Sequence, residues 1–238
     1  MDDRRGISLW SDIVSALSGE LSNTGVFATT GTFIAFEGGE GSGKSTQSQL
    51  LKTALEERGQ EVLLTREPGG TNLGKVLRGI LLDPETGSLA PRAEALLYAA
   101  DRAHHVETVI KPALANQTVV ITDRYIDSSI AYQGGGRVLS GQEIARISRW
   151  ATDGLTPTLT ILLDLPAQIG FGRFAERDRL ESEPLDFHER VRSTFLERAA
   201  LYSDRYLVVD ATQSKEDISA QILERVLRLN SISRLKDK

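Results

Sequence analysis

The chain of 238 residues has no cysteine, so neither disulfide bonds nor thiolate-bound metals contribute to its fold or chemistry. It has no apolar run near the roughly 18 residues that a membrane helix needs. Basic residues are not in excess: the net charge is −5, which gives no reason to expect a nucleic acid as partner. These absences predict a cytoplasmic globular protein, long enough for one well-cored domain.

The first 30 residues differ in character from the rest. Apolar side chains recur there at helical spacing, and two acidic residues near the start are unlike the basic start of a signal peptide. We therefore expect an N-terminal extension over residues 1–30, either disordered or containing a short amphipathic helix over 8–20. One domain should follow over residues 31–238, since no linker rich in Pro, Gly or Ser divides it.

From residue 32 onward, short apolar runs alternate with stretches of helical periodicity. The apolar runs predict strands over residues 32–37, 61–65, 118–122, 158–165 and 206–209. The periodic stretches predict helices over 45–58, 73–82, 91–116 (kinked by Pro112), 142–151 and 215–229. Apolar strands separated by helices indicate an α/β fold, a three-layer α/β/α sandwich with a five-stranded parallel sheet. Its ligands should bind at the carboxyl ends of the strands.

The stretch GGEGSGKS, residues 38–45, fits the pattern G-x-x-x-x-G-K-[ST] and lies between a predicted strand and a predicted helix. The glycines allow backbone N–H groups to surround phosphate oxygens at a helix N-terminus. Lys44 should reach the β- and γ-phosphates, and the Ser45 hydroxyl should bind Mg²⁺. The expected nucleotide is ATP or GTP, bound by Gly38, Gly39, Glu40, Gly41, Ser42, Gly43, Lys44, Ser45 and Thr46.

A GTPase switch would need two further loops, D-x-x-G and N-K-x-D. No D-x-x-G follows the phosphate loop. The nearest approach to N-K-x-D is SKED at residues 214–217, where serine replaces asparagine. The sequence therefore favours transfer of the phosphate to a second molecule.

Two segments at strand ends have residues suited to an acceptor. TREPGGT (65–71) carries Arg66, which can fork onto a phosphate or else lie on a surface turn. In LLYAADR (96–102), Tyr98 and Arg102 share a helix face. They either contact a base or are a core tyrosine and a surface arginine.

Two later segments add a metal ligand and a lid. Asp123 and Arg124 directly follow a predicted strand, where the carboxylate can hold Mg²⁺ and the arginine a phosphate. RFAERDRLESE (173–183) is either a solvated charged face or a short mobile lid that brings arginines to the transferred phosphate and excludes water.

The motifs FEGGEGSGKST, TREPGGT, LLYAADR, DRYIDSSIAYQGGGR and DRLE occur in this order, and the chain resembles bacterial thymidylate kinases over residues 32–229. The first motif is shared by many ATPases, whereas TREPGGT and DRY…AYQGGGR are far more specific to this family of P-loop nucleoside monophosphate kinases. The resemblance implies phosphorylation of dTMP to dTDP with ATP and Mg²⁺, by a homodimer. The alternatives are a kinase for another nucleoside monophosphate and a catalytically silent nucleotide-binding protein.

The resemblance also implies roles for single residues. Arg66 and Arg124 would hold the dTMP phosphate. Tyr98 would stack on thymine where the family usually has phenylalanine, and Arg102 would reach the base O4. A tyrosine, Tyr132, would lie against the deoxyribose and crowd a 2′-hydroxyl. The whole implied dTMP site is Glu40, Arg66, Tyr98, Arg102, Arg124, Ser128, Ser129, Tyr132 and Gln133.

Glycine follows Glu40 in the phosphate loop, where one form of the family has arginine. The other form, with basic residues in the lid, fits this chain. The lid candidates are Arg173, Arg177 and Arg179, the implied catalytic residues are Lys44, Arg124, Arg177 and Arg179, and the implied metal ligands are Ser45 and Asp123.

Overall fold

The structure is a computed structural model that describes residues 26–27, 31–136, 139–172 and 178–229. The extension expected over residues 1–30 therefore lies almost wholly outside the described residues. So do two of the three lid candidates, Arg173 and Arg177.

Five strands form the main sheet: β2 (Phe33–Glu37), β3 (Val62–Arg66), β4 (Val119–Asp123), β6 (Leu159–Asp164) and β7 (Tyr206–Asp210). Their order is β3-β4-β2-β6-β7, and all neighbours in it are parallel. The predicted five-stranded parallel sheet is confirmed. From the central β2 the chain crosses first to β3 and β4 on one side and later to β6 and β7 on the other. The carboxyl end of β2 is therefore a topological switch point, where such sheets bind ligands.

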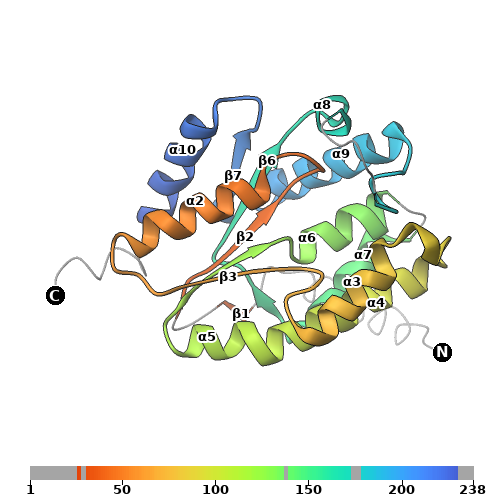
Figure 1. The fold of residues 1–238 in the computed structure, drawn as a ribbon, viewed down its shortest axis with the longest axis horizontal. Coiled ribbons are helices and arrows are strands. Elements are labelled where there is room, and N and C mark those ends of the chain that lie inside the picture. Colours follow the sequence, from red (N-terminus) through yellow and green to blue (C-terminus); the bar gives the residue numbers. More distant parts are fainter. Residues whose placement is uncertain (1–25, 28–30, 137–138, 173–177, 230–238) are drawn as a thin grey trace, which may run out of the picture.

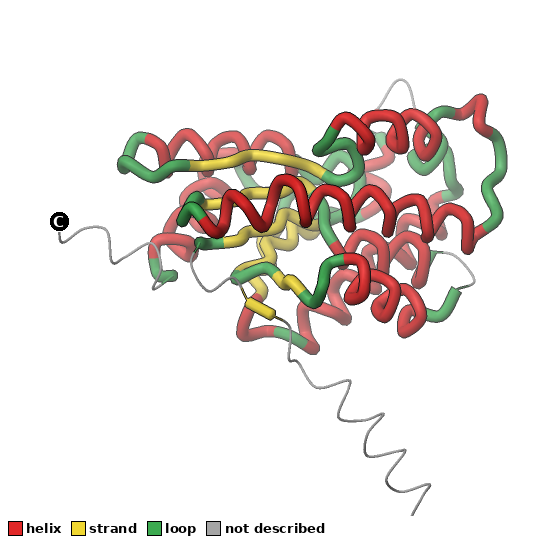
Figure 2. The backbone as a smooth tube through the Cα atoms, turned by 90° about the horizontal axis from the view of Figure 1, so that it is seen from below, coloured by secondary structure: helices red, strands yellow, loops and turns green. Residues whose placement is uncertain are grey.

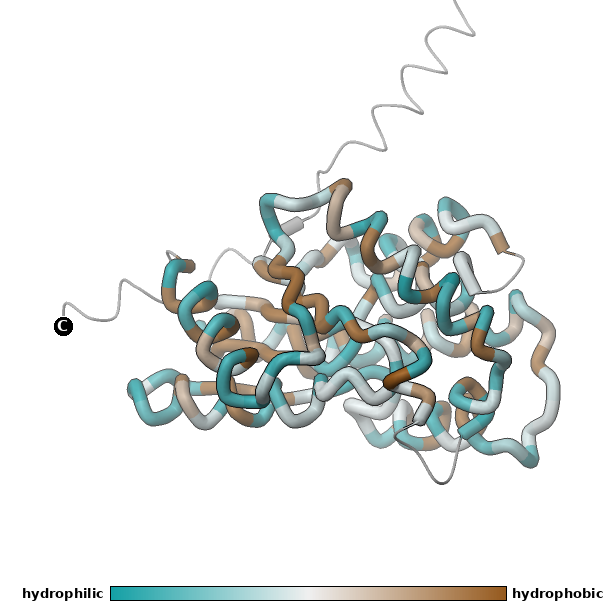
Figure 3. Tube along the Cα trace, turned by 90° about the horizontal axis from the view of Figure 1, so that it is seen from above, coloured by the Kyte–Doolittle hydropathy of each residue, from teal (hydrophilic) through white to brown (hydrophobic). Residues whose placement is uncertain are grey.

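Helices cover both faces of this sheet (Figures 1 and 2). On one face α2 (Lys44–Glu56) and α10 (Lys215–Leu227) pack against the strands, and on the other α5 (Lys111–Ala115) and α9 (Leu185–Leu201) do so. Side chains alternate along β2, so that Ile34 and Phe36 join the α2/α10 core while Phe33 and Ala35 join the opposite core. Figure 3 shows this pattern as hydrophobic strands at the centre and helices of mixed character around them.

The remaining helices lie beyond the carboxyl ends of the strands and beside the α5 face. They are α3 (Asn72–Leu82), α4 (Pro91–His105), α6 (Ile126–Ser129), α7 (Gly141–Ala151) and α8 (Ala167–Phe171), with π-helical turns at Val106–Ile110 and Ile130–Gly135 and 3₁₀ turns at Pro84–Thr86 and Ser203–Arg205. The helix predicted over 91–116 is interrupted by the first π-helical turn, just before Pro112. Proline has no N–H to donate and its ring crowds the preceding turn, so the regular ladder cannot continue there.

A second, two-stranded parallel sheet joins β1 (Val26–Phe27) to β5 (Leu155–Thr156). The sequence does not predict it, because two-residue strands are too short to show a period.

Candidate active site

The phosphate loop connects β2 to α2 and turns at glycines. Gly38, Gly41 and Gly43 have φ angles of 140°, 67° and 92°, which residues with a side chain rarely adopt. A Cβ atom on Gly38 would lie 2.5 Å from the Leu163 carbonyl oxygen, so this position also needs glycine for space. The loop thus lies between a strand and a helix N-terminus, the context that its motif requires.

Lys44 folds back over the phosphate loop. Its Nζ donates to the carbonyl oxygens of Gly39 (2.7 Å) and Gly38 (3.2 Å) and to the Ser42 hydroxyl (3.4 Å). Burial, and then the positive charge of Arg124, lowers the pKa of Lys44 below its usual value. The ammonium group is therefore held against the loop, where the oxygens of a bound phosphate can take over from the carbonyls.

Ser45 and Asp123 meet at the carboxyl edge of the sheet, where the Ser45 hydroxyl donates to Asp123 Oδ2 at 2.6 Å. A hydroxyl and a carboxylate are oxygen ligands of the kind that Mg²⁺ takes, with phosphate oxygens and waters as further ligands. The described residues contain no group of three or more His, Cys, Asp or Glu side chains that could hold a metal by themselves.

Glu40, Arg124 and Tyr132 form a charged cluster beside the phosphate loop. Arg124 Nη2 lies 2.5 Å from Glu40 Oε1, which also accepts from the Tyr132 hydroxyl at 2.8 Å. The Arg124 guanidinium stands over the Tyr132 ring, 5.0 Å from its centroid. Burial opposes the charge of Glu40, but Arg124 and Lys44 outweigh it and lower the pKa of Glu40 to about 2. Both members of the ion pair are therefore charged at neutral pH, and Arg124 is oriented before a phosphate binds.

A buried carboxylate outside the predicted site fixes the turn that follows Arg124. Glu37 is fully buried at the end of β2. Its Oε1 accepts from the backbone N–H groups of Tyr125 (2.9 Å) and Ser128 (3.2 Å), and its Oε2 accepts from the Ser128 hydroxyl (2.5 Å). Burial, with the nearby charge of Asp127, raises the pKa of Glu37 to about 7. Arg124 has a φ of 71°, uncommon for a residue with a side chain, and these bonds hold the chain in that conformation. The available sequence signal was an acidic residue ending an otherwise apolar strand.

A pocket opens next to the Glu40–Arg124–Tyr132 cluster. Eight of the nine residues expected to bind dTMP line it: Glu40, Tyr98, Arg102, Arg124, Ser128, Ser129, Tyr132 and Gln133. Arg66 is not among the lining residues, and it is exposed at the carboxyl end of β3. The rest of the lining is Glu67, Pro68, Arg78, Leu82, Asp178, Leu180 and Glu181. Glu67 and Pro68 belong to the TREPGGT motif, and Asp178, Leu180 and Glu181 belong to the DRLE motif in the expected lid. Arg78 and Leu82 come from α3, for which the sequence predicts a helix but no contact with a ligand.

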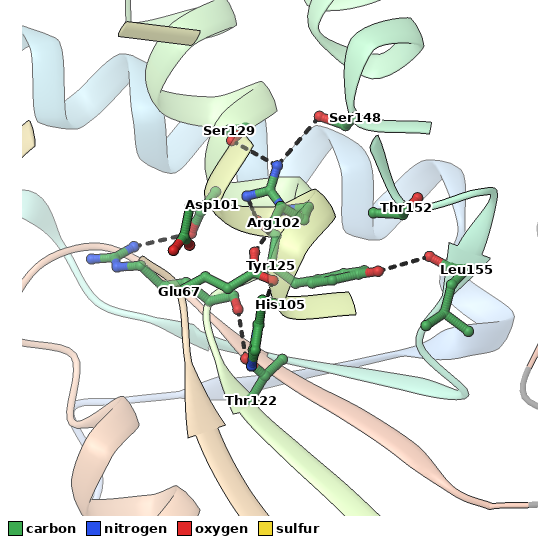
Figure 4. A network of polar contacts seen from close by, with 12 residues as sticks. Glu67, Asp101, Arg102, His105, Thr122, Tyr125, Ser129, Ser148, Thr152 and Leu155 are labelled. Carbon is green, nitrogen blue, oxygen red and sulfur yellow. Dashed lines mark hydrogen bonds and ion pairs between the residues drawn. The ribbon is translucent and has the colours of Figure 1, made fainter. Parts of the chain in front are cut away.

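Arg102 lies in a buried polar network at the pocket (Figure 4). It is 2% exposed, and its Nε donates to Glu67 Oε2 at 2.6 Å, its Nη1 to the Ser129 hydroxyl at 3.1 Å and its Nη2 to the Tyr125 carbonyl at 3.1 Å. His105 Nδ1 lies 2.9 Å from Glu67 Oε1. The alternative of a surface arginine is therefore wrong. Tyr98 is a core residue that also lines the pocket.

Arg179 is the one lid candidate that falls within the described residues. Its Nε donates to the Leu81 carbonyl at 2.8 Å, and its Nη2 lies 2.6 Å from Glu94 Oε2. The guanidinium thus contacts α3 and α4, two helices that also line the pocket next to the Glu40–Arg124–Tyr132 cluster.

A phosphate loop at the switch point of a parallel sheet, with a pocket lined by charged residues beside it, defines a phosphate-loop kinase. A family model described as thymidylate kinase matches residues 36–222. The thymidylate kinase of Clavibacter sepedonicus is 58% identical over 200 residues, which cover 82% of this chain and 94% of that relative. The thymidylate kinase of Leifsonia xyli subsp. xyli is 55% identical over 197 residues, covering 81% of this chain and 92% of the relative. The thymidylate kinase of Cutibacterium acnes is 49% identical over 199 residues, covering 84% and 98%. The chain belongs to the thymidylate kinase family.

This is the family that the motifs resemble, and the match extends over most of the chain. In the part of the chain that the structure describes, no helix has the length and apolar character needed to cross a membrane.

Proposed function

We propose that this protein is a dTMP kinase, which transfers the γ-phosphoryl group of ATP to dTMP and yields ADP and dTDP. Family membership supports the reaction. The observation that carries this proposal is the position of Arg124. It contacts the phosphate loop at the Gly38 carbonyl (3.2 Å) and also lines the pocket beside that loop. The use of intracellular nucleotides as substrates is our reason to propose a cytoplasmic location.

On the donor side, the residues hold the triphosphate and neutralise its charge. Lys44 leaves its loop carbonyls for the β- and γ-phosphates. Mg²⁺, held by Ser45 and Asp123, would offset the charge that develops on the transferred group. Asp123 is level with Phe36 in the sheet register, and this supports its placement at the mouth of the phosphate loop.

On the acceptor side, the residues position the nucleophile, which is an oxygen of the dTMP phosphate. No general base is needed because this oxygen is already anionic. Arg124 binds the phosphate, and Arg66 is a proposed second anchor, supported by its register position opposite Asp123. Correct in-line placement then supplies much of the rate enhancement.

The base and sugar are selected by the pocket wall. Tyr98 stacks on thymine, and Arg102 with Ser129 lies at its polar edge. Tyr132 lies against the deoxyribose. Tyr132 is 3% exposed and its hydroxyl is bonded to Glu40, so its ring is held in place against a 2′-hydroxyl.

We also propose that the protein forms a homodimer through α3 and α4. Leu73, Val76 and Ile80 are exposed apolar residues on one side of α3, and the exposed Leu96 lies on α4, against which α3 packs. Sedimentation of wild type and of Val76→Glu, whose residue is 62% exposed, tests this. The variant should be a monomer, and a monomeric wild type would contradict the proposal.

The substrate is tested by steady-state rates of ADP release with ATP, Mg²⁺ and each of dTMP, dUMP, UMP, CMP, GMP and AMP. The order dTMP, then dUMP, then UMP is expected. Tyr132→Phe keeps the ring and removes only the bond to Glu40. The variant should still prefer dTMP to UMP, by a smaller factor than wild type, because the ring is no longer anchored. Faster turnover of another monophosphate would overturn the substrate assignment.

A further inference from the structure

The turn that follows residue 177 is anchored to the acceptor side of the molecule. Besides its side-chain contacts with Leu81 and Glu94, Arg179 donates its backbone N–H to the Leu82 carbonyl at 3.0 Å. Leu81 and Leu82 end α3, and Glu94 lies on α4. One residue therefore ties this turn to two helices that precede it by about 85 to 98 positions.

The ion pair is deeply buried on both sides. The side chain of Arg179 is 10% exposed and that of Glu94 is 1% exposed. Gln133 Nε2, from the pocket wall, donates to Glu94 Oε1 at 3.1 Å. Moving Arg179 to a phosphate would take an ion-pair partner from a buried carboxylate, and breaking such a pair is strongly unfavourable.

The residues on either side of Arg179 form part of the acceptor pocket. Asp178, Leu180 and Glu181 all line it. Asp178 Oδ1 accepts from the backbone N–H groups of Leu180 (2.8 Å) and Glu181 (2.9 Å), which holds the turn in shape. Leu180 packs in the same core cluster as Tyr98 and is 6% exposed. The position of this wall thus depends on where Arg179 is anchored.

We propose that Arg179 is a positioning residue for the acceptor nucleotide: through its ion pair with Glu94 it holds the wall formed by residues 178–181 against α3 and α4. It does not stabilise the transferred phosphoryl group, so that, of the three lid candidates, Arg173 and Arg177 remain for that role. This inference rests on the proposed dTMP kinase activity, because the acceptor is the molecule that the wall contacts.

The two roles predict different kinetics. A positioning residue contributes to binding of dTMP in the ground state and in the transition state alike, so its loss raises KM for dTMP and changes kcat little. An arginine that contacts the transferred phosphate acts mainly in the transition state, so its loss lowers kcat at saturating substrate. Only in the positioning role should the loss of Glu94, which is on α4, have the same kinetic effect as the loss of Arg179.

The test is steady-state kinetics of Arg179→Ala, Arg179→Lys, Glu94→Gln and the Arg179→Ala/Glu94→Gln double variant, with dTMP and ATP varied separately. We expect Arg179→Ala and Glu94→Gln each to raise KM for dTMP about tenfold or more, with kcat and KM for ATP within about threefold of wild type. The double variant should be little worse than either single variant, because both remove one interaction. Arg179→Lys should recover part of the loss, since lysine keeps the charge but not the forked geometry.

Lys111→Ala is the control, because it breaks an exposed ion pair with Glu107 at 2.9 Å and should change neither constant. If Arg179→Ala lowers kcat about a hundredfold or more while Glu94→Gln behaves as wild type, the inference is wrong. Should Arg179→Ala fail to fold, Glu94→Gln and Arg179→Lys, which preserve side-chain size or charge, decide on the same criteria. Failure of wild type to phosphorylate dTMP would instead refute the proposed function.

Discussion

Replacement of Arg124 by alanine affects both the free protein and the reaction. In the free protein it removes the ion pair with Glu40, the bond to the Gly38 carbonyl and the stacking on Tyr132. The pKa of Glu40 falls from 4.5 to about 2, which corresponds to roughly 3 kcal/mol of favourable interaction with its neighbours. Arg124 shares this with Lys44 and Tyr132, so the variant should lose about 1–2 kcal/mol of stability at neutral pH.

The pH dependence of this loss has a defined sign. Because the folded pKa of Glu40 lies below its ordinary value, the stabilisation is complete above about pH 4.5 and disappears as the pH falls toward 2. The contribution of Glu40 to the difference in unfolding free energy between wild type and Arg124→Ala should therefore be constant near neutrality and shrink only in acid.

The effect on the reaction should be larger. Removing one member of a charge pair at a binding site typically costs about 2–5 kcal/mol, which corresponds to a loss of roughly 30-fold to a few thousand-fold in kcat/KM for dTMP. Arg124→Lys should retain part of the activity. The assay is ADP release at varied dTMP, with thermal unfolding to show that each variant is folded.

Arg228→Ala is the matched control, because it removes an exposed arginine that pairs with Glu224 near the end of α10. Its kinetics should equal those of wild type. A folded Arg124→Ala protein with kcat/KM within about threefold of wild type would refute the role given to Arg124.

Three further predictions concern stability and the metal. Gly74→Ala places a Cβ atom 2.3 Å from Asp101 Oδ1 and should cost about 1–3 kcal/mol of unfolding free energy. In Gly79→Ala, in the same helix, the Cβ atom meets nothing within 4 Å, and the variant should gain about 0.5–1 kcal/mol. Equal melting temperatures of the two variants would contradict this. Burial and the charge of Glu67 raise the pKa of Asp101 from 3.8 to about 6, so wild type should lose stability relative to Asp101→Asn, by up to roughly 3 kcal/mol, as the pH rises from about 4 to 6. A pH-independent difference in denaturant titrations would be inconsistent with that shift. Asp123→Asn should raise the Mg²⁺ concentration for half-maximal rate about tenfold, and excess EDTA should abolish turnover of wild type.

The sheet and the phosphate loop could be predicted from the sequence because their signals are local. Each strand is a continuous apolar run, and the predicted bounds differ from those of β2, β3, β4, β6 and β7 by one residue at most. The loop motif combines glycines, lysine and serine at fixed spacing. The sequence patterns on either side of it predict the strand that precedes it and the helix that follows it. Eight of the nine residues that the resemblance implies for dTMP line one pocket, and their contact with dTMP stays a prediction.

What escaped prediction depends on contacts between distant segments. Glu37 is a single acidic residue at the end of a strand, and its role becomes visible only when the turn after Arg124 folds onto it. The pair of Arg179 with Glu94 joins residues that are far apart in the chain and that carry no shared pattern. Arg66 shows the reverse case: its motif is clear, but its side chain is exposed beside the pocket and its contact with the acceptor stays a prediction.

The most direct test of the central claim is to identify the product. Purified protein is incubated with Mg²⁺, dTMP and ATP labelled in the γ-phosphate, and the nucleotides are separated by chromatography. We predict that the label moves from ATP to dTDP and that ADP and dTDP form in equal amounts. Label found in inorganic phosphate, or retained entirely in ATP, would contradict phosphoryl transfer to dTMP.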